Sequence, residues 1–86
     1  MYSKNVVVKS DVGLHAKAAT LFVAKANTFK SAVFVAKGDR KVNAKSLLGI
    51  MSMGIITGST VTLSAVGADA EAAVNALDTL LQRDVY

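Results

Sequence analysis

The sequence predicts an α+β fold in which helices cover one face of a four-stranded, mainly antiparallel sheet. Strand-like and helix-like stretches follow one another in the order strand, helix, strand, strand, helix, strand, helix, all within 86 residues. Hydrophobic residues make up 52% of the chain, enough for a two-layer core, and a chain of this length has no room for a second core. We therefore expect residues 1–86 to form a single domain.

The first part of the chain predicts a strand, a polar turn and a helix. Residues 2–9 are rich in valine, and residues 10–13 form a polar stretch that ends in glycine. From residue 16 to about residue 27, apolar side chains recur at steps of three and four, which is the spacing of one helix face. Lysines stand between them, so this helix is expected to turn a basic face to water.

The middle of the chain predicts a hairpin and a short helix. Residues 32–37 alternate between two faces, a Gly-Asp pair forms the turn, and residues 40–43 return as the next strand. The short helix is expected over residues 46–53. Ser46 is a good N-cap residue, because its hydroxyl can accept a hydrogen bond from an unpaired amide of the first turn. Gly54 is expected to close the C-terminal end.

The last part predicts a strand and a longer helix. Residues 60–66 alternate between apolar and polar side chains, as a half-buried strand does. Asp69 is a strong N-cap candidate for the helix that follows, and Glu71 lies in its first turn, where the helix dipole favours a carboxylate. An apolar stripe continues this helix to about Arg83.

Composition excludes several classes of site. The chain has no cysteine, one histidine and six scattered acidic residues, so we expect no disulfide, no metal site and no cofactor. Residues 46–68 carry no charge, but glycines and a polar run interrupt this stretch, which argues against a membrane-spanning helix. The expected location is the cytoplasm.

Positive charge is concentrated in the first half of the chain. Residues 1–45 hold nine Lys or Arg and two Asp, whereas residues 46–86 hold one Arg and four acidic residues. This imbalance favours an acidic or phosphorylated partner. A solvated lysine surface is the simpler alternative, and a nucleic-acid-binding module is a further one. The aromatic residues fall mostly on core-like positions, however, which leaves no platform on which bases could stack.

The only histidine, His15, stands where the polar turn meets the alanine-rich helix. The first backbone N–H groups of a helix have no partners within it, so this position suits an anion, and imidazole can itself carry a phosphoryl group. Taken without other evidence, a histidine at a helix start is more often a surface or capping residue than a functional one.

Two stretches resemble one known family. Gly13-Leu-His-Ala-Lys-Ala-Ala19 is similar to the active-site signature of HPr, the histidine phosphocarrier of the bacterial sugar phosphotransferase system, which normally reads Gly-Leu-His-Ala-Arg-Pro-Ala. Residues 43–54 resemble the regulatory serine region of that family in its low-GC Gram-positive form. The resemblance covers essentially all 86 residues, including the Thr-Gly-Ser turn at 57–59 and the Gly-Ala-Asp stretch at 67–69.

The resemblance implies the HPr open-faced β-sandwich, with the order βαββαβα. It also implies that His15 accepts a phosphoryl group from phosphoenolpyruvate through enzyme I and passes it to sugar-specific enzyme IIA domains. The backbone of Ala16 and Lys17 would cradle the phosphate, and the Lys17 cation would offset its charge. Such a protein is a carrier and not an enzyme.

The resemblance further implies regulation at Ser46. HPr kinase/phosphorylase would phosphorylate this residue, and the phosphorylated protein would bind the catabolite control protein. An exposed apolar patch would dock partners, and we expect it to comprise Thr20, Leu47, Leu48 and Met51, with Ile50 and Met53 in the core. The alternative is that all apolar side chains of the short helix are buried. We expect a monomer.

Two residues depart from the family signature. Lys17 replaces arginine, which keeps the charge but loses the planar fork that grips phosphate oxygens. Ala18 replaces proline, so the helix start is less preorganised. We therefore expect slower or redirected phosphotransfer. The alternative function is a regulatory HPr paralogue, similar to Crh or to the nitrogen-branch phosphocarriers, although the retained His15 argues against a Crh-like protein, in which the histidine is lost.

Overall fold

The computed structural model describes residues 1–9 and 16–82. Its elements are β1 Tyr2–Val7, α1 Ala16–Ala26, β2 Ala32–Lys37, β3 Arg40–Asn43, α2 Leu47–Ser52, β4 Thr60–Val66 and α3 Ala70–Gln82. The class and the element order therefore agree with the sequence prediction. None of the helices in the described residues has the length and hydrophobicity needed to cross a membrane.

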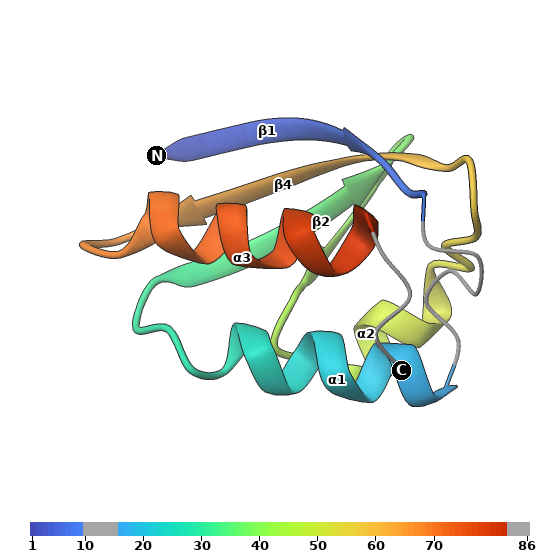
Figure 1. The fold of residues 1–86 in the computed structure, drawn as a ribbon, viewed down its shortest axis with the longest axis horizontal. Helices are drawn as coiled ribbons and strands as arrows, with labels where there is room; N and C mark the ends of the chain where they lie inside the picture. Colours follow the sequence, from blue (N-terminus) through green and yellow to red (C-terminus); the bar gives the residue numbers. More distant parts are fainter. Residues whose placement is uncertain (10–15, 83–86) are drawn as a thin grey trace.

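The four strands form one antiparallel sheet in the order β1-β4-β2-β3. Figure 1 shows the helices on one side of this sheet, with α3 running along β1 and β4 and α1 beside α3. Because side chains alternate along a strand, β4 turns Val61, Leu63 and Ala65 toward the helices, and all three are buried. On the opposite face of the sheet, Thr62 donates a hydrogen bond to Asn5.

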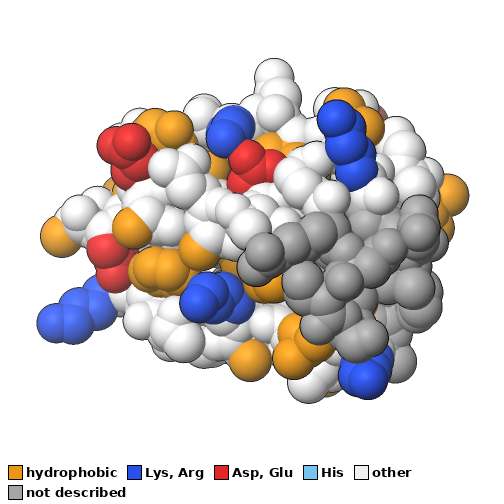
Figure 2. Space-filling view, in the orientation of Figure 1, with side chains coloured by type: hydrophobic (Ala, Val, Ile, Leu, Met, Phe, Trp, Pro, Cys, Tyr) orange, Lys and Arg blue, Asp and Glu red, His pale blue; other side chains and the backbone are white. Residues whose placement is uncertain are grey.

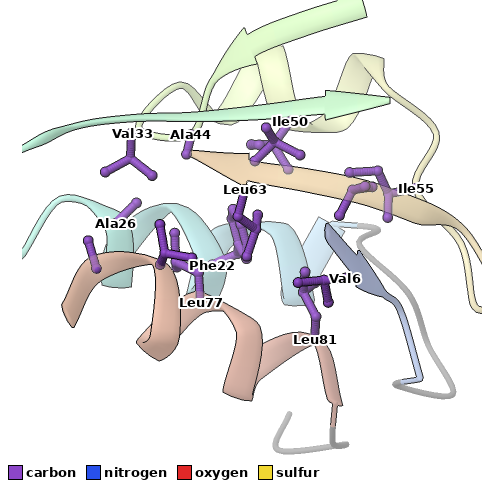
Figure 3. Close-up of a cluster of buried hydrophobic side chains, with 14 of the residues drawn as sticks. Val6, Phe22, Ala26, Val33, Ala44, Ile50, Ile55, Leu63, Leu77 and Leu81 are labelled. Atoms are coloured by element: carbon purple, nitrogen blue, oxygen red, sulfur yellow. The ribbon is translucent and has the colours of Figure 1, made fainter. Parts of the chain in front are cut away.

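The hydrophobic core lies between the sheet and the helices (Figure 3). Phe22 and Ala26 enter it from α1, and Leu77 and Leu81 enter it from α3. Helix α2 contributes Ile50 to the core. Burying a large aliphatic or aromatic side chain contributes about 1.5–3 kcal/mol, so this cluster is the main reason that the sheet and the helices stay together.

The first strand ends two residues earlier than the sequence predicts. β1 stops at Val7, and the next two residues leave the β1–β4 ladder for other partners. The amide of Val8 donates to the carbonyl of Ser59 (2.9 Å), and the amide of Lys9 donates to the carbonyl of Leu81 in α3 (2.9 Å). Valine content could not show this change of partner, because both new acceptors are distant in the sequence.

Both predicted caps of the short helix are confirmed. Ser46 has extended backbone angles, and its Oγ accepts a hydrogen bond from the amide of Gly49 (3.1 Å). Gly54 follows the last helical residues with a φ of +63°, a left-handed conformation that suits glycine. Gly49 also brings α2 close to β3, because an added Cβ would lie only 3.4 Å from the Cβ of Val42.

The carboxylate of Asp69 has partners that its N-cap position did not predict. It accepts hydrogen bonds from the amides of Lys30 and Ser31 (both 2.9 Å) and from the hydroxyl of Ser31. Asp69 takes part in the start of α3 through its backbone carbonyl, which accepts a hydrogen bond from the amide of Ala73 (2.9 Å). Gly67 allows the two segments to lie this close together, because a Cβ on Gly67 would lie 2.8 Å from the Cα of Ser31. Asp69 thus ties the start of α3 to the start of β2.

Candidate functional site

The predicted phosphoryl acceptor, His15, lies outside the described residues. Helix α1 begins at the next residue, Ala16. The first turn of α1 contains no acidic residue. Helix N-termini usually attract carboxylates, because the helix dipole is positive there. In α1 no carboxylate of the first turn offsets this positive end, which agrees with the anion-binding role predicted for the amides of Ala16 and Lys17.

The two residues that depart from the HPr signature differ in their surroundings. The side chain of Lys17 is exposed, so its ammonium group can meet a phosphate from solvent. Ala18 is buried, and so is Ala19. The alanine that replaces proline therefore packs into the core. It also supplies a backbone N–H that proline lacks, within the first turn where such groups have no helical partner.

Ser46 is half-buried at the start of α2. Its amide donates to the carbonyl of Asn43 (3.0 Å), and its own carbonyl accepts from the amide of Ile50 (3.0 Å). The side chain of Asn43 accepts from the amide of Lys45 (2.8 Å). These bonds shape the turn before the helix and leave Ser46 in the extended conformation that an N-cap residue needs.

The turn before Ser46 is also attached to α1 and to the sheet. Ala44 is fully buried, and its amide donates to the carbonyl of Val33 (2.8 Å). The ammonium group of Lys45 donates to the carbonyl of Phe29 (2.8 Å), and the side-chain amide of Asn27 donates to the carbonyl of Lys45 (3.3 Å). The residues just after α1 therefore hold the turn that presents Ser46.

Helix α2 turns most of its apolar side chains to solvent. Leu48 is 81% exposed, and Leu47 and Met51 are also exposed, whereas Ile50 and Met53 are buried. The alternative that all of these side chains are core is wrong. We call Leu47, Leu48 and Met51 the α2 apolar face, because exposed large apolar side chains on a short helix are typical of a contact surface.

Two further residues outside α2 are exposed. Thr20, a predicted docking residue, is exposed on α1, the helix that packs against α2. Ile56, which is 65% exposed, was not singled out from the sequence. An aliphatic residue in a connector gives no periodic signal, and only the structure shows that its side chain is exposed.

Charge is separated between the two long helices. Figure 2 shows acidic side chains over α3 and the neighbouring sheet edge, whereas the charged side chains over α1 are basic. Lys4 of β1 forms an ion pair with Asp78 of α3 (2.6 Å). Within residues 1–9 and 16–82, no group of three or more His, Cys, Asp or Glu lies together. The described part of the site is therefore a basic helix beside an apolar face.

The fold and the described part of the site agree with those of one known family. A model of the family PTS-HPr, described as the PTS HPr component phosphorylation site, matches residues 2–83. The chain belongs to this family of the phosphotransferase system.

Named relatives fall into two groups within the family. The chain is 45% identical over 85 residues to the HPr-like protein Crh of Bacillus subtilis strain 168, covering 99% of this chain and 100% of Crh. It is 37% identical over 81 residues to the phosphocarrier protein HPr of Neisseria meningitidis, covering 94% and 91% of the two chains. Similarity alone therefore does not separate a transport carrier from a regulatory paralogue.

Solved structures confirm the HPr fold. The crystal structure of HPr from Bacillus anthracis superposes with a TM-score of 0.92 at 46% identity, covering 94% of this chain and 96% of that one. The crystal structure of Bacillus subtilis Crh has a TM-score of 0.76 at 45% identity, covering 95% and 94%, and is described as an intertwined dimer with a swapped domain. The expectation that this chain is a monomer finds no support in these relatives.

Proposed function

We propose that this protein carries a phosphoryl group on His15, received from phosphoenolpyruvate through enzyme I and delivered to sugar-specific enzyme IIA domains. The observation that carries the proposal is the family match over residues 2–83, together with a histidine retained directly before α1. Ser46 is the second modification site of the proposal. Because phosphoenolpyruvate and ATP would be the donors, the proposal places the carrier in the cytoplasm.

The transfer chemistry follows from the properties of imidazole. With an ordinary pKa of about 6.5, a histidine is largely neutral at cytoplasmic pH, and its ring nitrogen can act as a nucleophile. The nitrogen of His15 would attack the phosphorus held on a histidine of enzyme I, forming one N–P bond as the other breaks. A second transfer of the same kind would pass the group to enzyme IIA, breaking the N–P bond of His15 as a bond to a nucleophile on enzyme IIA forms. Lys17 and the first amides of α1 would offset the charge of the moving group.

Regulation would act through the N-cap of α2. A kinase would transfer the γ-phosphoryl group of ATP to the oxygen of Ser46, adding a charge of roughly −1.5 to −2 at a helix N-terminus. That position tolerates negative charge, so the fold would persist. The new charge would repel an acidic surface on a phosphotransfer partner and would offer a recognition feature to the catabolite control protein.

Mass spectrometry of the intact protein tests both sites. We expect incubation with phosphoenolpyruvate and enzyme I to add an acid-labile phosphate, absent from the variant His15→Ala. Incubation with ATP and HPr kinase/phosphorylase should add an acid-stable phosphate, absent from Ser46→Ala. Each variant serves as the control for the other site. If neither phosphate forms on the wild-type protein, both parts of the proposal are wrong.

A regulatory paralogue similar to Crh is the second candidate. The 45% identity to Crh over nearly the whole chain and the departures at Lys17 and Ala18 favour it. Delivery to enzyme IIA separates the candidates, because a regulatory protein would be phosphorylated on Ser46 but would pass little phosphate onward. The variant Lys17→Arg restores the family fork, and we expect it to transfer phosphate several-fold faster. Equal rates for the two proteins would show that position 17 does not limit transfer.

A further inference from the structure

Helix α2 is too short to keep its position unaided. It has six residues, and Ile50 is its only buried residue. Isolated helices shorter than about 12–15 residues are marginal in water. Ile50 anchors the middle of the helix, and the buried Ala44 and Met53 anchor the chain on either side of it. Hydrogen bonds at the two ends add to these anchors and orient α2.

The β2–β3 hairpin supplies the bonds at the C-terminal end. Nη1 of Arg40 donates to the carbonyl of Ser52 (2.9 Å), and Nη2 donates to the Oγ of the same residue (3.1 Å). The ammonium group of Lys37 donates to the carbonyl of Gly54 (3.2 Å). The last carbonyls of a helix have no partner within it and carry partial negative charge, so cations suit this end. Helix α2 has no basic residue of its own in its last turn.

These bonds continue through the helix to Ser46. The hydroxyl of Ser52, which accepts from Arg40, donates to the carbonyl of Gly49 (2.7 Å). The amide of Gly49 in turn donates to the Oγ of Ser46 (3.1 Å). Gly49 is therefore held from both sides, by Ser52 at its carbonyl and by Ser46 at its amide. An added Cβ on Gly49 would make a tight contact with the Oγ of Ser46 (3.3 Å).

We propose that Arg40 is a positioning residue for phosphorylation of Ser46. Through Ser52, Arg40 holds Gly49 where its amide fixes the rotamer of the Ser46 side chain. The Oγ of Ser46 then accepts the hydrogen bond from the Gly49 amide, and its hydroxyl group is presented to the kinase in one orientation. Holding a nucleophile in a productive geometry is worth a large factor in rate. This inference rests on the proposed function for Ser46, and it assigns a role in that function to a residue of β3, outside α2.

Lys41 provides a matched control. It is the next residue on β3 and is also an exposed cation, so its loss changes the net charge equally. Its ammonium group lies over the ring of Phe34 (4.7 Å to the centroid). Neighbouring residues of a strand point to opposite faces, and Lys41 accordingly has no part in the chain of bonds to α2.

The experiment measures ATP-dependent phosphorylation by purified HPr kinase/phosphorylase on the full-length protein. We expect Arg40→Gln to lower kcat/KM by about tenfold, the effect of losing one hydrogen bond to a charged group, with Lys41→Gln within about twofold. Arg40→Lys should restore part of the rate, because a lysine can donate to Ser52 but not through two nitrogens. Ser52→Ala should resemble Arg40→Gln, and the double variant should be no worse than either alone, because all three break the same chain.

Hydrogen exchange of the Gly49 amide gives a second readout. Arg40→Gln should speed this exchange several-fold relative to the amide of Leu63 in β4, which reports global stability. Equal kinase kinetics for Arg40→Gln and Lys41→Gln would overturn the proposal and assign the effect to charge alone. Unchanged exchange at Gly49 would also overturn it. A wild-type protein that the kinase does not phosphorylate would instead contradict the proposed function of Ser46, and the exchange measurement would still decide the role of Arg40.

Discussion

Helices α2 and α3 are held by different forces. Helix α3 has 13 residues and buries five side chains, including Val74, Leu77 and Leu81. Helix α2 has six residues and buries one. The position of α3 follows from the removal of apolar surface from water, whereas α2 is fixed by hydrogen bonds at both ends. A helix held in the second way can leave its apolar side chains exposed, and those side chains are then available to a partner.

The largest expected effect breaks the burial that holds α3. We expect Leu77→Ala, at a fully buried position, to lower the free energy of unfolding by about 2–5 kcal/mol. The loss combines the transfer of the missing atoms with the cavity that they leave. Chemical denaturation of the variant and the wild type gives this value. A change below about 1 kcal/mol would mean that the core collapses around the smaller residue.

The next effect concerns the carboxylate that ties α3 to the turn before β2. The hydroxyl of Ser31 and the amide of Lys30 lower the pKa of Asp69 from 3.8 to about 2. A folded-state pKa below the unfolded value means that the ionised carboxylate stabilises the fold above about pH 4. This stabilisation is lost as the pH falls toward 2.

We expect Asp69→Asn to be less stable than the wild type at neutral pH and to lose less stability on acidification. Denaturation curves measured from pH 6 to pH 2 test this, because the difference between the two proteins should shrink at low pH. Curves that stay parallel over the whole range would show that Asp69 ionisation is not linked to folding.

A smaller effect is expected at the N-cap of α2. Ser46→Ala removes the acceptor for the Gly49 amide, and loss of an N-cap side chain typically costs about 1 kcal/mol. Urea denaturation measures this change. Ser46→Asn retains a capping oxygen and should recover most of it. If Asn and Ala are equally destabilising, the cap bond contributes little to the free energy of unfolding.

The smallest stability effect is expected on the α2 apolar face. Leu48→Ala, at a side chain that is 81% exposed, should change the free energy of unfolding by no more than about 0.5 kcal/mol. It should nevertheless raise the KM for phosphotransfer from enzyme I, because contact area is lost only in the complex. An unchanged KM, measured beside a control such as Val66→Ala on the sheet, would remove Leu48 from the docking surface.

Local signals made the element order and the helix caps predictable. The alternation in β4 and the helical spacing in α1 reflect only which side chains face the core. Ser46 accepts from the amide three residues further on, and Gly54 takes a left-handed conformation directly after the C-cap residue. Interactions of this range leave their pattern in neighbouring residues, so the sequence by itself determines them. The family signature around His15 is equally local, and it indicated the class of chemistry before any contact was known.

Tertiary structure decided the interactions between residues that are distant in sequence. The carboxylate of Asp69 binds Ser31 across 38 positions, and Arg40 reaches Ser52 across 12. Neither contact has a periodic pattern, because each depends on how the sheet brings two turns together. The exposure of Leu48 was likewise suggested by the resemblance but established by packing. Which apolar side chains of a short helix face the core depends on the single anchor, Ile50, and on the bonds that orient the helix around it.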